Sequence, residues 1–293
     1  MATELKEFTC KKEWLKARTG YLTSTEIAAL FNAERSGQYG KSLFELWHEK
    51  KNKTFEYTEG GNDARKGLYF EPAIAKWFSD IHDLAIVPFR DFAFDDETRQ
   101  GASFDYEILG GCIDDIDMSS AIMEIKTAKY SIYKEKWVND MPPAYIDFQV
   151  QLQMKLAGRK RAVIVLFVDG EMSPRHWIVE ACPVVHKAID IKVAEFWKSI
   201  DDNVEPEPDF DKDSKFVISQ HQESEGVEEA SEDLIKMLEQ YKSVKAGEKE
   251  TTKCLASLRA QIFRSTDAEL LTYDDEKISL ATSKAGIRSL KFK

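Results

Sequence analysis

Residues 121–130 read AIMEIKTAKY and carry two charged side chains, Glu124 and Lys126, inside an apolar run. Side chains two residues apart lie on the same face of a β-strand, so both charges would project from one face of a strand here. The same spacing recurs at Glu4/Lys6, Glu49/Lys51 and Asp190/Lys192. The pair therefore fits either a solvated strand face or half of a metal-dependent active site, and the neighbouring segments decide between them.

Helical and strand-like patterns alternate on both sides of this stretch. Apolar residues recur at helical spacing before residue 84, whereas short apolar runs separated by turn residues follow it. The order helix, three strands, helix, strand, helix predicts an α/β domain with a mixed sheet. Helices are expected within 10–32 (with a break at Gly20), 42–51, 62–81, 143–158 and 182–200, and strands at 84–94, 101–109, 120–128 and 162–170.

Composition divides the chain into three parts. Residues 1–200 hold the predicted α/β domain. Residues 201–227 are polar and acidic and contain two prolines, which is typical of a linker or a surface excursion. Residues 228–293 are expected to form a small accessory module of two helices, broken near Gly247, followed by a β-hairpin.

At 293 residues, with 43% hydrophobic and 32% charged residues, the chain has the composition of a soluble globular protein. Its formal net charge of −11 argues against a protein that coats nucleic acid by general attraction, but it is compatible with a local basic groove. The four cysteines form no C-x-x-C pair, so neither structural zinc nor a disulfide framework is expected. No apolar run has the length of a membrane span, and the N-terminal residues lack the apolar core of a secretory signal. A cytoplasmic location is therefore expected.

Carboxylate and polar side chains are expected to converge at one edge of the predicted sheet. Hydrolysis of a phosphodiester needs an activated water and cations that stabilise charge on the phosphate, and Mg²⁺ held by Asp and Glu oxygens supplies both. An antiparallel hairpin would bring Asp105 of the preceding strand close to Glu124 and Lys126. The helix before the sheet adds Glu71, and the helix after it adds Gln149.

Five segments between Trp14 and Gly170 carry motifs in a fixed order. They are WLKARTGYLTSTEIAALF (14–31), KGLYFEP (66–72), GASFDYEI (101–108), MEIKTA (123–128) and PPAYIDFQVQLQMKLAG (142–158). Together they resemble the restriction-endonuclease-like PD-(D/E)xK nucleases, and among these the lambda-exonuclease or YqaJ-type viral recombinases. Each segment alone is a weak signal, whereas five in order over half the chain are specific. The resemblance implies a restriction-endonuclease-like core with flanking helices, so that residues 1–200 would be a nuclease domain.

The resemblance also implies roles for individual side chains. A divalent metal would be held by Asp105, Glu124 and the backbone carbonyl of Ile125, and Glu71 would support the metal or its water. Lys126 would act on the water. Mg²⁺ is the expected metal, and Mn²⁺ is expected to substitute for it. The catalytic residues implied are Asp105, Glu124, Lys126, Glu71 and Gln149, of which the last would hold the geometry of the site.

A second set of residues matches positions that the family uses to hold a 5′-phosphate of DNA. A guanidinium group together with hydroxyl groups suits the recognition of a phosphate. The residues implied are Arg18, Thr25, Ser103 and Arg35.

The aspartate that accompanies Glu124 is open to two readings. Asp105 stands nineteen residues before Glu124 and is followed by Tyr106, where the family often has a shorter separation and a glycine. Asp114, ten residues before Glu124, is therefore a rival. Asp105 is preferred because DDETRQGASFD (95–105) matches the family's sequence leading into this strand. With that alignment, Ser103 also matches a position of the family.

The helix at 143–158 carries two further features. Gln153 lies four residues after Gln149, on the same face, and is predicted to face solvent. The basic run from Lys155 to Arg161 fits contacts to DNA phosphates, but it equally fits the negative end of a helix dipole.

The resemblance implies a Mg²⁺-dependent 5′→3′ exonuclease that degrades one strand of linear double-stranded DNA from its ends. It would leave 3′ single-strand overhangs for phage-type recombination by strand annealing, encoded by a phage or prophage and acting in the bacterial cytoplasm. The implied partners are double-stranded DNA ends, further copies of the chain in a ring, most commonly a trimer, and a single-strand annealing protein, with no membrane.

Two other functions compete with this one. An endonuclease of restriction or repair type on the same core would not need the 5′-phosphate set. A non-catalytic DNA-binding or assembly subunit would not need intact Asp105, Glu124 and Lys126.

Overall fold

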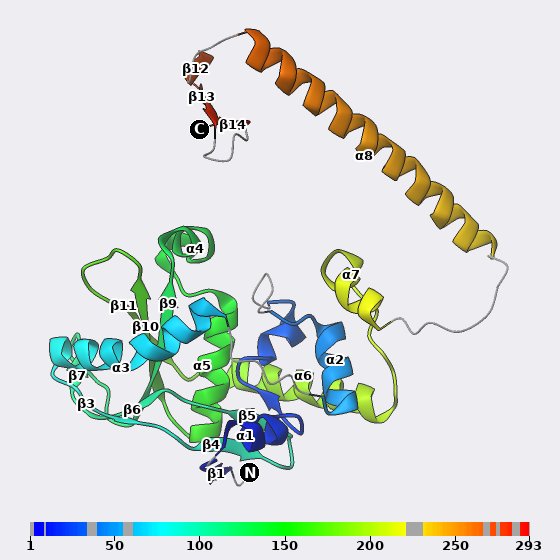
Figure 1. Cartoon of the computed structure of the whole chain (residues 1–293). Helices are drawn as coiled ribbons and strands as arrows, with labels where there is room; N and C mark the ends of the chain where they lie inside the picture. Colours follow the sequence, from blue (N-terminus) through cyan, green and yellow to red (C-terminus); the bar gives the residue numbers. More distant parts are fainter. Residues whose placement is uncertain are drawn as a thin grey trace. The chain divides into compact units, whose positions relative to one another are not determined.

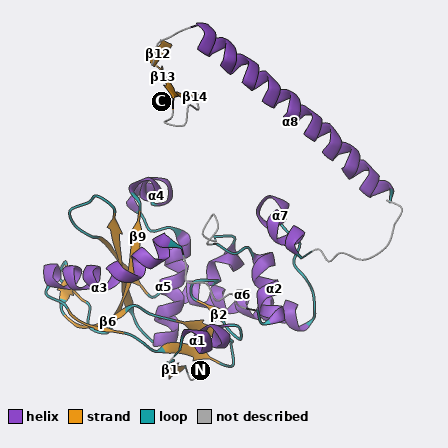
Figure 2. Ribbon diagram, viewed as in Figure 1, coloured by secondary structure: helices purple, strands orange, loops and turns teal. Residues whose placement is uncertain are grey.

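The computed structural model describes residues 3–8, 10–33, 40–54, 61–220, 231–265, 270–273, 276–282 and 288–292. It divides into two compact units, Met1–His221 and Gln222–Lys293 (Figures 1 and 2). None of the described helices combines the length and the apolar character that a bilayer crossing requires.

A five-stranded mixed sheet forms the centre of the first unit. Its strand order is β11-β10-β9-β6-β3, in which β9 and β10 are parallel and the other neighbours are antiparallel. Strand β9 is the stretch AIMEIKTA, and it lies in the middle of the sheet. The α/β class with a mixed sheet is thereby confirmed. The strands are β3 (Ala85–Pro88), β6 (Tyr106–Gly110), β9 (Ala121–Ala128), β10 (Arg161–Val168) and β11 (Arg175–Glu180).

Helices cover both faces of this sheet, because β9 and β10 carry apolar side chains on both faces. Ile122 of β9 belongs to the cluster that includes α5 (Ala144–Ala157) and α6 (Pro183–Asp201). Met123 belongs to the cluster that includes Phe78 of α3 (Asn62–His82). Alternate residues of a strand point to opposite faces, so α3 and α5 lie on opposite sides of β9 (Figure 1).

A second sheet, of order β1-β4-β5-β2, carries the N-terminal segment. The segment expected to be helix, break and helix is instead a helix, a short strand and a 3₁₀ helix. The elements are β1 (Glu4–Lys6), α1 (Lys11–Arg18), β2 (Leu22–Thr23), η1 (Ile27–Phe31), α2 (Leu43–Asn52), β4 (Phe92–Asp95) and β5 (Gln100–Ala102).

Two of the expected strands are each divided between the two sheets. The segment 84–94 forms β3 in the central sheet and β4 in the second, and the segment 101–109 forms the end of β5 and most of β6. The first break follows Pro88, whose ring removes a backbone donor. The second break spans residues 103–105, so Ser103 and Asp105 lie in the connection between β5 and β6.

Short elements complete the first unit. A two-residue turn at Asp114 and Asp115, both with positive φ, joins β7 (Cys112–Ile113) to β8 (Ile116–Asp117), as a tight hairpin requires. Helix α4 (Tyr130–Lys136) follows β9, and the 3₁₀ helix η2 spans Val138–Asp140. Part of the segment expected as a linker forms α7 (Phe210–Ser219), whose Phe216 packs against Phe44 of α2.

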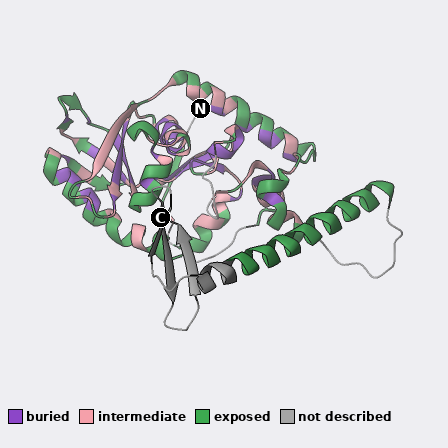
Figure 3. Cartoon of the chain, turned by 90° about the horizontal axis from the view of Figure 1, so that it is seen from above, coloured by how far each residue is buried: buried purple, intermediate pink, exposed green. Residues whose placement is uncertain are grey.

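The second unit differs from the expected helical hairpin and β-hairpin. Glu232–Ser265 is one continuous helix, α8, that is not broken at Gly247, because a single glycine costs a helix only about 1 kcal/mol. The C-terminal strands β12 (Leu270–Tyr273), β13 (Glu276–Thr282) and β14 (Arg288–Phe292) form a three-stranded antiparallel sheet. Residues 232–258 of α8 are exposed throughout (Figure 3).

Candidate active site

The pairing of β6 with β9 places Asp105 directly opposite Glu124. Tyr106 pairs with Met123 in an antiparallel register, and Glu107 and Ile108 continue it. Extending this register by one residue beyond the end of β6 sets Asp105 against Glu124. The Asp105 carboxylate is fixed there, since its Oδ2 accepts a hydrogen bond of 2.7 Å from the backbone N–H of Ile125.

The Glu124 carboxylate is buried and is held by three donors. Lys126, on the same face of β9, donates its ammonium to Oε1. Gln149 of α5 donates its amide to the same oxygen at 2.6 Å, and its own carbonyl accepts from Lys126 at 3.1 Å. Gln153, one turn further on, donates to Oε2 at 2.7 Å. Glu124, Lys126 and Gln149 are thus brought together as the sequence predicted.

Gln153 is not solvent-facing, and that prediction was wrong. Its side chain is 0% exposed, and its amide also donates to the backbone carbonyl of Ser103 at 2.8 Å. It therefore ties the segment before Asp105 to the Glu124 carboxylate. The signal was present in the sequence, since Val150 and Met154 lie on one face of α5 and Leu152 lies on the opposite face. A helix that is apolar all round is buried and offers no solvated face for a glutamine.

Three carboxyl groups and one ammonium group share this site. Burial raises the pKa of Asp105 well above its usual value, and the neighbouring Glu124 raises it further. Burial and Glu124 also raise the pKa of Glu71, which reaches the site from α3. Burial acts to lower the pKa of Lys126, but the charges of Glu124 and Asp105 outweigh it, so the pKa is raised and the group is an ammonium ion at neutral pH.

The rival aspartate, Asp114, lies elsewhere in the fold. It occupies the tight turn between β7 and β8, its side chain is 77% exposed, and its carboxylate lies 3.6 Å from His176. The structure therefore brings Asp105, and not Asp114, to Glu124.

The donor set suits a divalent cation of the Mg²⁺ type. When all are ionised, Glu71, Asp105 and Glu124 outweigh Lys126, and a bound cation would relieve the repulsion that raises the pKa values of Asp105 and Glu71. Within the described part of the chain, no three His, Cys, Asp or Glu side chains form a cluster that holds a metal alone. Mg²⁺ commonly uses one or two carboxylates together with water and substrate phosphate, so Asp105, Glu124 and the carbonyl of Ile125 fit it.

The residues expected to bind a 5′-phosphate form a second group around Arg18. Nη2 of Arg18 donates to the hydroxyls of Thr23 at 3.0 Å and Thr25 at 3.2 Å. Ser103 does not contact Arg18. Its hydroxyl instead accepts from the indole of Trp14 at 3.2 Å, and the guanidinium of Arg18 lies 4.6 Å from the centre of the Trp14 ring. Sequence reasoning missed Thr23 and Trp14, and Arg35 lies outside the described residues.

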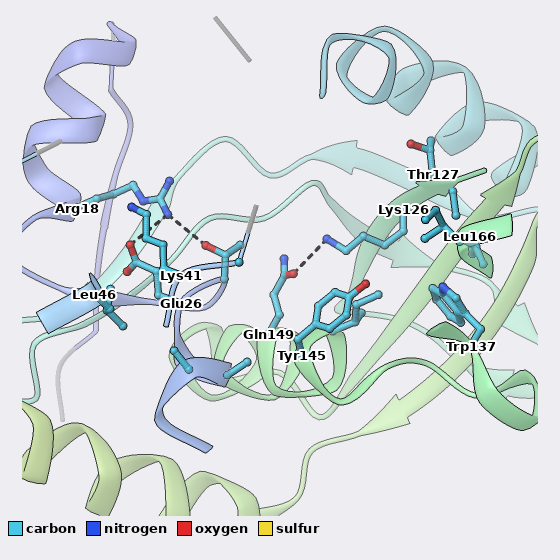
Figure 4. A pocket seen from close by; sticks show the side chains of 17 residues that line it. Arg18, Glu26, Lys41, Leu46, Lys126, Thr127, Trp137, Tyr145, Gln149 and Leu166 are labelled. Carbon is cyan, nitrogen blue, oxygen red and sulfur yellow. Dashed lines mark hydrogen bonds and ion pairs between the residues drawn. The ribbon is translucent and has the colours of Figure 1, made fainter. Parts of the chain in front are cut away.

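One pocket of about 380 Å³ joins the two groups. Arg18 and Glu26 line one end, and Lys126 lines the other (Figure 4). Gln149 projects into the space between them (Figure 4). Thr25, which accepts a hydrogen bond from Arg18, also lines the pocket. Apolar side chains of η1, α2, α4, α5 and β10 complete the wall. A chain segment with an anion at each end would therefore meet a guanidinium at one end and an ammonium beside carboxylates at the other.

The contacts of Gln153 predict a change in metal requirement. Substitution Gln153→Leu keeps the volume of the side chain but frees Oε2 of Glu124 from its amide donor. Loss of a group that orients a metal ligand typically costs 10- to 100-fold in metal affinity or activity, so the Mg²⁺ concentration for half-maximal activity is expected to rise by about that factor. Titration with Mg²⁺ at saturating DNA measures it.

Gln151 provides the matched control for this variant. It is also a buried glutamine of α5, but it bonds the backbone of Glu180 and Cys182 and not Glu124. Gln151→Leu is expected to lower the unfolding temperature without moving the Mg²⁺ midpoint. Equal midpoints for both variants would contradict an orienting role for Gln153.

Comparison with known proteins gives one family match and a set of similar structures. Residues 13–160 match the model of the YqaJ-like viral recombinase domain. The chain is similar to LHK-Exo, an alkaline exonuclease from Laribacter hongkongensis. A crystal structure of LHK-Exo with dAMP superimposes with a TM-score of 0.52 at 19% identity, covering 71% of this chain and 100% of that one. A second LHK-Exo structure superimposes with a TM-score of 0.50 at 20% identity, again covering 71% of this chain and 100% of that one. No curated protein matches the chain. At these identities the structural likeness shows the fold, which agrees with the expected restriction-endonuclease-like core.

Proposed function

The chain belongs to the YqaJ-like viral recombinase family, and we propose that it is a Mg²⁺-dependent 5′→3′ exonuclease of linear double-stranded DNA. It would degrade one strand from each end and leave 3′ overhangs for recombination by strand annealing. The observation that carries the proposal is the group of Asp105, Glu124 and Lys126, of which Lys126 lines one end of a pocket whose other end holds Arg18.

Asp105, Glu124 and the carbonyl of Ile125 would hold the Mg²⁺, which supplies a Lewis acid and lowers the pKa of a water molecule. Gln149 and Gln153 fix the Glu124 carboxylate, so that its orientation is set before DNA binds. The charges of Glu124 and Asp105 raise the pKa of Lys126, and as an ammonium ion Lys126 would orient the water and stabilise negative charge on the phosphate.

Arg18 with Thr25 would bind the 5′-phosphate, and Thr23 would share in positioning the guanidinium. Ser103 would belong to the same phosphate set, with its hydroxyl positioned by the indole of Trp14. Glu71 would support the metal or its water from α3, and Arg35 remains part of the proposed phosphate set by family resemblance alone.

The same resemblance supports three further proposals about assembly and location. Copies of the chain would form a ring, with a trimer favoured, and a basic lining would let an acidic protein pass DNA. A single-strand annealing protein would take up the 3′ overhang. The protein would act in the cytoplasm of a bacterial host, with Mn²⁺ able to replace Mg²⁺.

Digestion of matched DNA substrates tests the proposed function. Purified full-length chain is mixed with linear duplex or covalently closed circular duplex of the same sequence, with Mg²⁺ or with EDTA. We expect digestion of the linear duplex in Mg²⁺, with label lost first from the 5′ ends, and none in EDTA. Cutting of closed circles would instead indicate an endonuclease, and inert linear DNA in Mg²⁺ would favour the non-catalytic subunit.

A further inference from the structure

A buried ion pair, Glu26 and Lys50, stands directly behind Arg18. The Lys50 side chain is about 1% exposed, and its ammonium lies 2.8 Å from Oε2 of Glu26. The same ammonium donates to the backbone carbonyl of Arg18 at 3.0 Å. The backbone N–H of Thr23 adds a second donor to Oε2 of Glu26 at 2.9 Å. Lys50 is too deeply buried to touch DNA itself, so its effect on the pocket must pass through its neighbours.

The Glu26 carboxylate can compete with a phosphate for the guanidinium of Arg18. Its free oxygen, Oε1, lies 3.9 Å from Nη2 of Arg18, and Figure 4 shows the two side chains together at one end of the pocket. Burial acts to raise the pKa of Glu26, but attraction to Lys50 and Arg18 and the hydrogen bonds it accepts lower that pKa to about 2. Glu26 is therefore negatively charged at any working pH. A carboxylate and a phosphate use the same donors of a guanidinium, so an uncompensated Glu26 would occupy Arg18.

We propose that Lys50 determines the preference of this pocket for a phosphate by neutralising Glu26 and so leaving Arg18 free to bind the anion. Lys50 is in this sense a positioning and specificity-determining residue, and its role rests on the proposed function of Arg18 in binding the 5′-phosphate. The ligand concerned is the terminal phosphate monoester of a DNA 5′ end.

The charges at this end of the pocket agree with this role. Lys50 and Glu26 cancel, so Arg18 is left with a net charge of one. Lys41, which also lines the pocket, forms an ion pair with Glu49. The other groups in contact with the Arg18 guanidinium are the hydroxyls of Thr23 and Thr25 and the ring of Trp14, none of which carries charge.

Four variants of the full-length chain test the proposal. For each, binding of 5′-phosphorylated and 5′-hydroxyl duplex ends is measured by fluorescence anisotropy in Ca²⁺, which replaces the catalytic metal, and the ratio of the two affinities is the readout. Lys50→Met is expected to lower this ratio about tenfold, because Glu26 stays charged and turns to Arg18. The double variant Lys50→Met/Glu26→Gln is expected to restore the ratio to within about threefold of the parent, because Arg18 again has no charged competitor.

Restoration by the double variant separates this role from a structural one. If Lys50 only supported the fold, removing its partner as well would not return the preference. Glu26→Gln alone is expected to keep or raise the ratio, and it provides a test even if Lys50→Met fails to fold. A tenfold fall of the affinity ratio in Glu26→Gln would overturn the inference, and so would an unchanged affinity ratio in folded Lys50→Met.

Arg18→Met distinguishes this inference from the proposed function. Loss of the preference in Arg18→Met, with no change in Lys50→Met, would leave the phosphate role of Arg18 standing and would refute only the role of Lys50. A parent chain with no preference for 5′-phosphorylated ends would refute both.

Discussion

Replacing Lys126 with alanine is expected to lower the rate of cleavage of linear duplex DNA by about 10³-fold while leaving DNA affinity within a few-fold of the parent. Loss of a positioned proton-transfer group or of a group that stabilises developing charge typically costs 10²- to 10⁴-fold. Lys126 is the ammonium that contacts both Glu124 and Gln149, so its removal takes away the positive charge at the proposed reacting end of the pocket. Nucleotide release in Mg²⁺ measures the first quantity, and anisotropy in Ca²⁺ measures the second.

Lys192 offers a matched control, because it has the same sequence spacing from a carboxylate but lies on the surface of α6. Its ammonium pairs with Glu195, and its side chain is 46% exposed. Lys192→Ala is therefore expected to keep the parent rate. A Lys126→Ala variant that retained more than about a tenth of the parent rate would contradict the proposed role, given the magnitudes expected for such groups.

Asp105→Asn is expected to lower the rate of DNA cleavage about as much as Lys126→Ala does. The cleavage rate of Asp114→Asn is expected to stay within about twofold of the parent rate. Asp105 lies opposite Glu124 and is a carboxylate that a metal can use, and loss of such a group removes an effect worth several kcal/mol. Asp114 lies in an exposed turn. Rates of digestion in Mg²⁺ for the two variants, measured side by side, provide the comparison.

The stability of Asp105→Asn separates lost chemistry from lost folding. Burial and the charges of Glu124 and Glu71 raise the pKa of Asp105, so its ionised form is costly in the metal-free protein. Removing the charge is therefore expected to leave the unfolding temperature unchanged or to raise it. Retained activity in Asp105→Asn together with lost activity in Asp114→Asn would show that the strand assignment is wrong.

Local patterns in the sequence were sufficient for the part of the fold that carries the chemistry. The alternation in AIMEIKTA identified β9, and the apolar run 162–170 identified its parallel neighbour β10. The family motifs lie within single elements, so they are visible without any knowledge of packing. For the same reason the resemblance to YqaJ-type recombinases was confirmed.

Features that depend on contacts distant in sequence were not predicted. The division of 84–94 between two sheets depends on which strands accept each half as a partner, and the burial of Gln153 depends on what covers α5. Thr23 and Trp14 have no motif of their own, and they matter only because α1 and β2 bring them to Arg18. Helix α8 is continuous because Gly247 lowers helix stability only slightly, whereas the sequence analysis expected Gly247 to break the helix.

The choice between Asp105 and Asp114 is the clearest case of this limit. Asp105 lies within the second predicted strand and Asp114 lies between the second and the third. The spacing to Glu124 favoured Asp114, whereas the flanking sequence favoured Asp105. Only the register of β6 against β9, together with the tight turn between β7 and β8, sets Asp105 beside Glu124.

A crystal structure of the protein soaked with Mn²⁺, with the ion located by its anomalous scattering, would show which aspartate holds the metal. We expect a peak bound by the carboxylates of Asp105 and Glu124 and by the carbonyl of Ile125. A peak at Asp114, or a fully occupied ion that does not contact Glu124, would contradict this expectation.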